Sequence, residues 1–249
     1  MRKACIYTVF DQNNAKYFPA FENSLRKFHK AEDLPLIVYG TQEEMKDPIN
    51  FYRATPMFAR RLIDEYELVI KMDVDSIVCA PLTEVLEKPY DVGVVLNSNP
   101  REFKKWQVQV WNIPPMAYFN CGFVAMRSKE FIEHWWTLCN KPMFNDYPYK
   151  EQDLLNIMIH YGNYKVECFD NGDYFYGLAS NSYWNHFELR GDDIVLPVIK
   201  EDNFMWPIMK EKKIVVLHFA EGQASMTKGN YKIKVNEEVS KRLDFLTHE

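Results

Sequence analysis

The fold of this chain is decided by the stretch Leu68-Val69-Ile70-Lys71-Met72-Asp73-Val74-Asp75-Ser76-Ile77-Val78, an apolar run that carries two carboxylates one residue apart. A strand that persists through Val74 would direct Asp73 and Asp75 to the same face, because side chains alternate along a strand. Two such close carboxylates repel each other unless a cation joins them. Hard divalent ions such as Mg²⁺ and Mn²⁺ bind carboxylate oxygens and complete their shell with water or phosphates, so the pair predicts a seat for a metal-diphosphate complex. The alternative interpretation is a strand end with two solvated acids.

The composition is that of a globular, enzyme-sized protein. The 249 residues are 47% hydrophobic and suit one compact domain, or one with an elaborated C-terminal part. Lys and Arg number 30 against 35 Asp and Glu, and the resulting net charge of −5 with no dense basic block argues against a nucleic-acid partner.

The cysteine spacing and the N-terminal residues indicate the cellular location of the protein. The five cysteines contain no CxxC pair, which argues against a disulfide framework or a zinc knuckle and indicates a reduced, cytoplasmic setting. The apolar run after Met1-Arg2-Lys3 ends by Phe10-Asp11, too short for a signal sequence or a membrane anchor. We therefore expect no direct membrane span.

Strand and helix patterns alternate along the first part of the chain. Strands are expected at Ala4–Phe10, at Leu34–Gly40 and before Asp73, with helices at Ala15–His29 and Met57–Glu65 between them. Such alternation predicts a parallel α/β sheet, whose ligands bind beyond the carboxyl ends of the strands. The two acids then lie where a ligand is expected.

The second part of the chain is less regular. The segment Tyr164–Glu211 has no clear periodicity, and the loop Asn97–Pro115, with Trp106 and Trp111, has the length of a mobile lid or a disordered segment. The remaining elements are expected as a short helix, two strands, two helices, a late strand and a terminal helix, at Pro81–Leu86, Asp91–Leu96, Tyr118–Met126, Lys129–Leu138, Glu151–His160, Ile214–Phe219 and Val235–Leu246.

Absent motifs narrow the chemistry. The chain has no GxGxxG, GxxxxGK[ST], GxSxG or HExxH, so dinucleotide, P-loop, serine-hydrolase and zincin sites lack their sequence basis. Three signals at strand ends are left: the acid pair, an Asn120-Cys121-Gly122 turn, and His218 after an apolar run. An imidazole can complete an Mn²⁺ shell that carboxylates leave open, whereas the alternative is a packed core histidine.

Together these features resemble the GT-A fold glycosyltransferases, in particular the glycogenin-like and galactosyltransferase-like family 8 of retaining enzymes. The similarity covers most of the chain, and its motifs follow the order of the family. The matching segments are the first strand and helix from Ala4–Thr8 to Ser24-Leu25, the basic position in Phe51-Tyr52-Arg53, the FNxG-like Tyr118–Phe123, the DQDxLN-like Glu151–Asn156, and the HF-like Leu217-His218-Phe219.

The resemblance implies a Rossmann-like α/β catalytic domain over residues 1–249, with a mainly parallel central sheet flanked by helices. Its nucleotide-binding part would be residues 1–97 and its donor and acceptor part residues 98–249. It implies sugar transfer from a nucleotide-diphosphate donor, a UDP-sugar, to a glycan, protein or small hydroxyl acceptor, with retention. Asp73, Asp75 and His218 would hold Mn²⁺ or Mg²⁺, which would stabilise the departing diphosphate as a Lewis acid.

The resemblance also implies roles for further residues. Gln152 and Asp153 would be the catalytic contacts near the sugar ring, the alternative being a solvated first helical turn. Two departures from the family pattern are Glu151 in place of the first acid of DQD, and residues 220–228 in place of a glycine and KPW. Donor binding would fall to Thr8, Phe10, Arg53, Asp73, Asn120, Gly122 and Lys228.

Two other functions compete with sugar transfer. An apolar strand that ends in DxD is also typical of haloacid-dehalogenase-type phosphatases, with Gly191-Asp192-Asp193 as their later acidic motif, although a strand, a helix and another strand precede the acid pair here. A non-catalytic nucleotide-sugar or glycan-binding module would also use the aromatic residues, 15% of the chain, to stack on rings. The sequence leaves the base, the sugar, the acceptor and the oligomeric state open.

Overall fold

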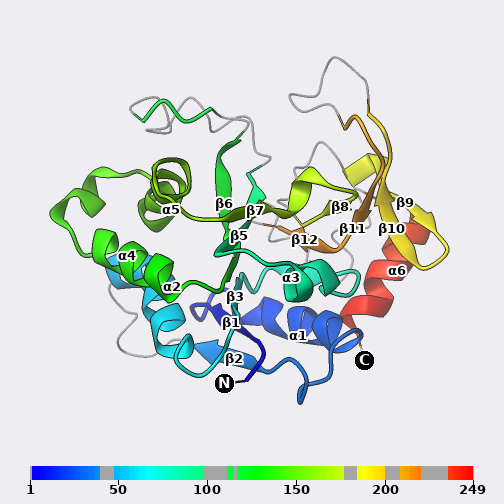
Figure 1. Cartoon of the computed structure of the whole chain (residues 1–249). Coiled ribbons are helices and arrows are strands. Elements are labelled where there is room, and N and C mark those ends of the chain that lie inside the picture. The colour runs from blue at the N-terminus through cyan, green and yellow to red at the C-terminus, as the bar shows by residue number, and fades with distance from the viewer. Residues whose placement is uncertain are drawn as a thin grey trace.

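A six-stranded sheet forms the centre of the molecule. The computed structural model describes residues 2–39, 48–97, 111–114, 117–176, 184–199, 208–219 and 235–248. The sheet has the order β2-β1-β3-β6-β5-β7 (Figure 1). Strand β6 pairs antiparallel with both of its neighbours, and the other pairings are parallel. The expected mainly parallel sheet is confirmed, and its strands are β1 Cys5–Val9, β2 Leu36–Tyr39, β3 Val69–Met72, β5 Val92–Leu96, β6 Phe119–Met126 and β7 Val166–Cys168.

Helices cover both faces of this sheet and divide the core in two (Figure 1). One face packs against α2 (Pro48–Leu62), α4 (Lys129–Cys139) and α5 (Lys150–Tyr161); the other packs against α1 (Phe18–Arg26) and α6 (Glu237–Thr247). Alternate residues of β1 enter opposite cores, and β1, β3 and β6 are buried along their whole length. Burial on both faces explains why these strands read as continuous apolar runs.

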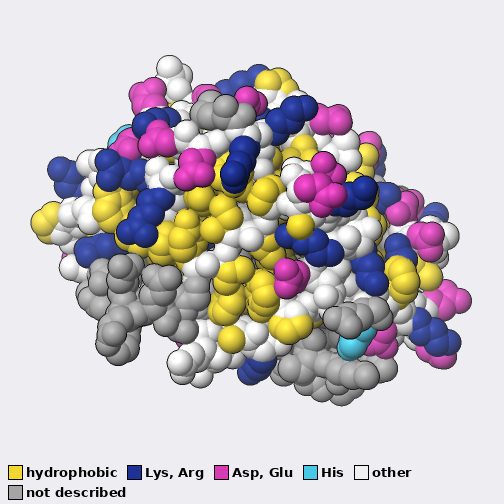
Figure 2. Space-filling view, turned by 90° about the horizontal axis from the view of Figure 1, so that it is seen from below, with side chains coloured by type: hydrophobic (Ala, Val, Ile, Leu, Met, Phe, Trp, Pro, Cys, Tyr) yellow, Lys and Arg dark blue, Asp and Glu magenta, His cyan; other side chains and the backbone are white. Residues whose placement is uncertain are grey.

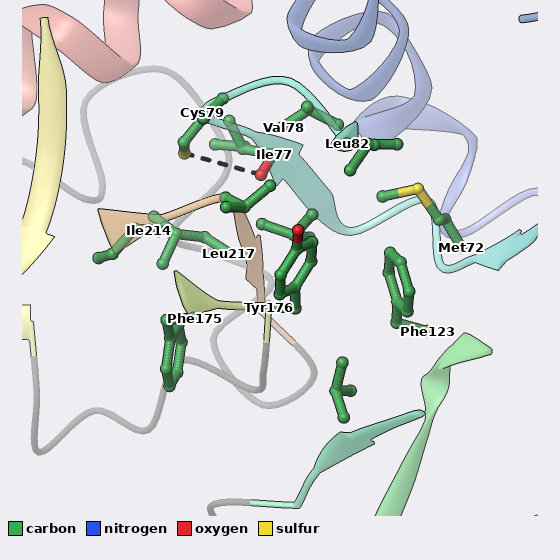
Figure 3. Packing of buried hydrophobic residues seen from close by; sticks show 14 of the residues in the cluster. Met72, Ile77, Val78, Cys79, Leu82, Phe123, Phe175, Tyr176, Ile214 and Leu217 are labelled. Atoms are coloured by element: carbon green, nitrogen blue, oxygen red, sulfur yellow. Dashed lines mark hydrogen bonds between the residues drawn. The ribbon is translucent and has the colours of Figure 1, made fainter. Parts of the chain in front are cut away.

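Two smaller sheets extend the core on the face that packs against α1 and α6. Strand β4 (Ser76–Val78) pairs antiparallel with β12 (Val216–His218), and a four-stranded sheet has the order β8-β11-β10-β9. Figure 3 shows Met72 and Phe123 of the central sheet in one cluster with Leu217 of β12 and with Tyr176, whose ring centroid lies 5.7 Å from that of Phe123. This packing ties β12 to the end of β3.

The other elements are short. They are α3 Thr83–Glu87, β8 Tyr174–Phe175, β9 Glu188–Arg190, β10 Asp193–Leu196, β11 Lys212–Ile214 and the 3-10 turns Ala15–Tyr17, Pro142–Asp146, Phe169–Asn171 and Trp184–His186. Among the helices of the described segments, none combines the length and the apolar character that a membrane crossing needs.

Several expectations about single elements were wrong. The late strand at Ile214–Phe219 is two strands, β11 and β12, because the chain passes from one small sheet to the other at Val215. Helix α2 begins at Pro48 rather than Met57, since Pro56 lies inside the helix and reads in sequence as a helix start. The irregular segment contains strands β7 to β10 in its described parts, and of the loop at 97–115 the structure describes 97 and 111–114.

Charges of both signs are interspersed on the described part of the face seen from below, around a central group of hydrophobic side chains (Figure 2). Some of the exposed charges form ion pairs, such as Arg60 with Glu133 at 2.6 Å. Exposed pairs of this type stabilise a fold by at most about 1 kcal/mol. The fold therefore depends on its two cores rather than on surface charge.

Candidate active site

Three side chains with metal-binding atoms meet at the carboxyl end of β3. The Nε2 atom of His218 lies 3.3 Å from Oδ2 of Asp73 and 3.2 Å from Oδ1 of Asp75. One ligand atom from each residue lies within 4.8 Å of the others. The strand does not persist through Val74, because Val74 and Asp75 form a turn that leads into β4. The two acids converge through this turn and through the pairing of β4 with β12.

Gly122 makes the close approach of His218 possible. A Cβ atom at this position would lie 2.1 Å from Cε1 and 2.4 Å from Nδ1 of His218, distances that no side chain tolerates. The backbone N–H of Gly122 donates to Oδ1 of Asn120 at 2.6 Å, and its carbonyl accepts from the N–H of Asp73 at 2.8 Å. The expected turn at Asn120-Cys121-Gly122 is wrong: these residues lie within β6, which reaches this edge because it runs antiparallel to β3.

Lys71 belongs to the site, and the sequence interpretation missed it. Its Nζ atom contacts Oδ1 of Asp73 and donates to the carbonyl of Cys121 at 2.8 Å. Burial lowers the pKa of Lys71, but the Asp73 carboxylate, with Cys121 and Glu151, outweighs burial, so that the pKa is raised. A lysine within an apolar run is a signal that sequence alone provides, because a buried charge requires a partner.

The same contacts act on Asp73 and His218. Burial opposes the charged form of Asp73, but the Lys71 ammonium and the His218 ring hold the pKa of this carboxyl well below its usual range. Burial likewise opposes a charged His218, whereas Asp75 and Asp73 raise the pKa of the imidazole to about 9. Neither ring nitrogen makes a well-aligned hydrogen bond to a residue that the structure describes. An imidazole among two carboxylates, with no ordinary partner, has the donor set of a divalent transition-metal ion such as Mn²⁺.

Two members of the cluster, Asp73 and His218, line a cleft of about 240 Å³, whereas Asp75 lies beside them and does not line it. The walls come from β1, α2, β3, β6, α5 and β12. Five residues expected in the site line it, namely Asp73, Asn120, Gly122, Gln152 and His218. Lys71, Glu151, Tyr52 and Thr55 line it as well.

Glu151 is the second ionisable group that the sequence interpretation did not place in the cleft, and its side chain is partly buried. Its Oε2 atom is buried and has no hydrogen-bond partner among the described residues. Burial raises the pKa of this carboxyl to about 8. The preceding residue, Lys150, has a φ of 48°, a left-handed conformation that is costly for a side chain other than glycine. A strained backbone thus brings to the cleft a carboxyl of which one oxygen has no partner among the described residues.

Gln152 and Asp153 have different surroundings. The Oε1 atom of Gln152 accepts from the N–H of Cys121 at 2.8 Å, and Gln152 lines the cleft. Asp153 is buried, accepts from the hydroxyl of Tyr118 at 2.7 Å and from the N–H of Tyr149 at 2.8 Å, and does not appear among the lining residues. The structure therefore places Asp153 as a link between α5 and β6, behind the cleft wall.

Other residues expected to bind the donor lie outside the cleft. Arg53 donates from Nε to the carbonyl of Cys139 at 2.9 Å and lies over the ring of Phe144. Thr8 and Phe10 are buried beside Val9, and Val9 contributes to the lining because alternate residues of a strand face opposite sides.

Two further sequence predictions concern Lys228 and the acidic motif of the phosphatase alternative. Lys228 lies outside the described residues. In the acidic motif Gly191-Asp192-Asp193, the first two residues form the turn of the β9-β10 hairpin and Asp193 begins β10, with Asp192 exposed.

Comparison with known proteins identifies the fold. No protein-family model and no curated protein sequence matches the chain. The crystal structure of the galactosyltransferase LgtC in complex with donor and acceptor sugar analogues matches 96% of this chain and 99% of that chain, with a TM-score of 0.57 and 14% identity. An active-site mutant of LgtC matches with a TM-score of 0.54 and 14% identity, over 96% of this chain and 95% of that chain. The bifunctional glycosyltransferase WbbM matches 97% of this chain and 52% of that chain, with a TM-score of 0.52 and 15% identity. The chain has the GT-A fold of these glycosyltransferases, as its sequence predicted.

Proposed function

We propose that this protein is a metal-dependent glycosyltransferase that moves a sugar from a nucleotide-diphosphate donor, a UDP-sugar, to a hydroxyl group of a glycan, protein or small acceptor, with retention. The observation that carries the proposal is the convergence of Asp73, Asp75 and His218 in a GT-A fold, with Asp73 and His218 in the lining of a cleft. Residues 1–249 would act as one catalytic domain, with a nucleotide-binding part at 1–97 and a donor and acceptor part at 98–249.

Asp73, Asp75 and His218 would hold Mn²⁺ or Mg²⁺, which when bound supplies Lewis-acid stabilisation of the diphosphate leaving group. Without the ion, each carboxylate about 4 Å from a phosphate oxygen repels it by roughly 1 to 4 kcal/mol. The two acids therefore make donor binding depend on a divalent cation. Lys71 and Gly122 orient this set, the first by its contact with Asp73 and the second by admitting the His218 ring.

Sugar contacts would fall to the N-terminal turn of α5. Glu151 and Gln152 line the cleft. Asp73 is the one other acidic residue in its described lining. A buried carboxyl without a partner gains most from a ligand hydroxyl, because leaving it unpaired costs about 1 to 3 kcal/mol. Asp153 would act indirectly, since it holds Tyr118 and the start of α5 in place.

Donor hydrolysis and thermal shifts test the proposal. Purified protein is incubated with UDP- and GDP-sugars, with Mn²⁺ or with EDTA, and nucleoside diphosphate release and melting temperature are measured. We expect slow hydrolysis of one UDP-sugar and a stabilisation that both require Mn²⁺. With an acceptor found by screening, the anomeric configuration of the product, read by NMR, tests retention.

Variants localise the effect. Asp75→Asn should lower Mn²⁺-dependent hydrolysis by about 100-fold or more, because outer-shell partners of metal ligands alone are worth about 10- to 100-fold. Gly122→Ala should also lower it, by displacing the His218 ring. Asp193→Asn is the matched control, an acid paired with Lys213 and outside the cleft lining, and should leave hydrolysis unchanged.

Two results would favour the other functions. Nucleotide-sugar binding with no hydrolysis and no transfer to any acceptor would indicate a binding module. Phosphate release from a generic phosphomonoester, without nucleoside diphosphate release, would indicate a phosphatase.

A further inference from the structure

The cleft contains a cation of its own. Lys71 is 5% exposed, in the middle of the buried strand β3, and it lines the cleft. Its ammonium contacts Oδ1 of Asp73 and donates to the carbonyl of Cys121 at 2.8 Å. A buried lysine side chain loses conformational freedom, and its ammonium loses hydration. Both effects destabilise the fold unless partners compensate the buried charge.

The contact divides the two oxygens of Asp73. Oδ1 contacts the Lys71 ammonium. Oδ2 lies 3.3 Å from Nε2 of His218, the same atom that lies 3.2 Å from Oδ1 of Asp75. Asp73 can therefore offer one oxygen to an ion in the cluster while the other remains bound to lysine. The ammonium also removes one negative charge from the set: with His218 as a neutral ligand, two carboxylates and one ammonium leave a net charge of −1 facing a divalent ion.

A divalent ion is consequently attracted less strongly than by two free carboxylates, and it is repelled by the nearby ammonium. The burial of Lys71 strengthens this repulsion, because a charge away from water is poorly screened. A nucleotide-sugar diphosphate brings further negative charge to the same end of the cleft. Its arrival would restore the attraction that Lys71 removes.

We propose that Lys71 couples metal binding to donor binding: its ammonium weakens the capture of a free divalent ion, so that the ion and the diphosphate of the donor bind together. The inference rests on the proposed function, because it concerns the same cluster and the same diphosphate. Thermodynamic linkage requires the effect to be mutual, so Mn²⁺ strengthens nucleotide binding by the factor by which the nucleotide strengthens Mn²⁺ binding.

The test is a titration of Mn²⁺, alone and with saturating UDP, read by the electron paramagnetic resonance signal of free Mn²⁺ and corrected for the Mn²⁺-UDP complex in solution. Three substitutions are compared with the wild type. Lys71→Met removes the charge, Lys71→Gln removes the charge but keeps a hydrogen-bond donor for Asp73 and Cys121, and Lys71→Arg keeps the charge. Lys88→Met, at a lysine paired with Glu84 and Glu167 outside the cleft lining, is the control.

We expect the wild type to bind Mn²⁺ weakly alone and at least tenfold more tightly with UDP. The neutral variants should bind Mn²⁺ alone at least tenfold more tightly than the wild type, and the gain from UDP should shrink by the same factor. Lys71→Arg and Lys88→Met should keep the wild-type coupling. Circular dichroism and melting curves establish that each variant is folded, and Lys71→Gln decides if Lys71→Met does not fold.

Two outcomes overturn the inference and remain distinguishable. If a neutral variant weakens Mn²⁺ binding, or leaves the gain from UDP unchanged, Lys71 orients Asp73 without controlling the order of binding, and the proposed function stands. If the wild type binds no Mn²⁺ even with UDP, the proposed function fails and the inference fails with it.

Discussion

Charged and polar side chains make up much of the cleft wall. Lys71 and His218 lie in short strands whose other residues are hydrophobic, whereas Glu151 lies beside Gln152 in the first turn of α5. Lys71 is matched by Asp73 and by a backbone carbonyl, whereas the Oε2 atom of Glu151 has no partner among the residues described. Unpaired buried groups destabilise a fold, and they persist at sites where a ligand provides the partner.

Glu151 should make the stability of the free protein depend on pH. Its pKa is raised from 4.5 to about 8 in the folded state. Between these values the unfolded chain ionises while the folded chain keeps its proton, so the free energy of unfolding should fall as pH rises from 4.5 to 8 and then level off. Each pKa unit corresponds to about 1.4 kcal/mol. Urea unfolding at pH 5 and pH 8 should show this fall in the wild type and a smaller fall in Glu151→Gln.

The matched control for that experiment is Glu65→Gln, at an exposed glutamate outside the cleft lining. It should follow the wild-type pH profile. Parallel profiles for the wild type and Glu151→Gln would show that the carboxyl of Glu151 is ionised in the folded protein.

Individual elements bring these residues together by two devices. Strand β6 runs against its neighbours, so its first residues, rather than its last, reach the edge where β3 ends. Helix α5 begins at the same edge with Lys150 in a left-handed conformation, followed at once by Glu151 and Gln152. Backbone strain of this kind costs about 1 to 3 kcal/mol and concentrates at functional sites.

Replacement of Lys150 by glycine should relieve this strain. Lys150→Gly should leave the free energy of unfolding unchanged or raise it by up to about 1 kcal/mol, because glycine adopts a φ of 48° without a steric penalty. Lys141→Gly is the control, since Lys141 also precedes a helical turn but has a φ of −78°, and it should lose about 0.5 to 1 kcal/mol. Urea unfolding curves measure both. An equal loss in the two variants would show that the conformation of Lys150 is not strained.

At the scale of the whole molecule, the candidate site joins two sheets. Asp73 follows a strand of the central sheet, whereas His218 ends β12, which belongs to the small sheet with β4. These segments lie far apart in sequence and meet through the shared core of Figure 3. A bound ion would therefore add a further link between two sheets that the turn at 73–75 and hydrophobic packing already connect.

Hydrogen exchange should report this link. Mn²⁺ with UDP should slow exchange of the backbone N–H groups of Asp73 and Phe219, which donate to Gly122 at 2.8 Å and to Asp75 at 3.0 Å. The edge strand Leu36–Tyr39 should exchange at an unchanged rate and serves as the internal reference. Asp75→Asn should abolish the protection. Protection that appears equally in this variant would mean that the ligands bind elsewhere or without the cluster.

Much of this architecture could be predicted from the sequence, because periodicity and burial are local properties. The strands at the start of the chain, α1, α4 and α5 follow from apolar runs and helical spacing. The short strands β8 to β10, and the division of the late strand into β11 and β12, could not be predicted in the same way, since strands of two to four residues contain too little pattern and exist through their partners. Pro56 hid the start of α2 because a proline usually marks a helix boundary rather than an interior.

The sequence by itself determined the α/β class, the mainly parallel sheet and the identity of Asp73, Asp75 and His218 as the residues to examine, because each follows from a local pattern of apolar runs and their ends. Only the tertiary structure decided that Lys71 and Glu151 face the cleft, that Asp153 and Arg53 do not line it, and that Gly122 makes room for an imidazole. These outcomes depend on contacts between segments distant in sequence. The direction of a side chain is set by which strand or helix packs beside it, and no local pattern encodes that choice.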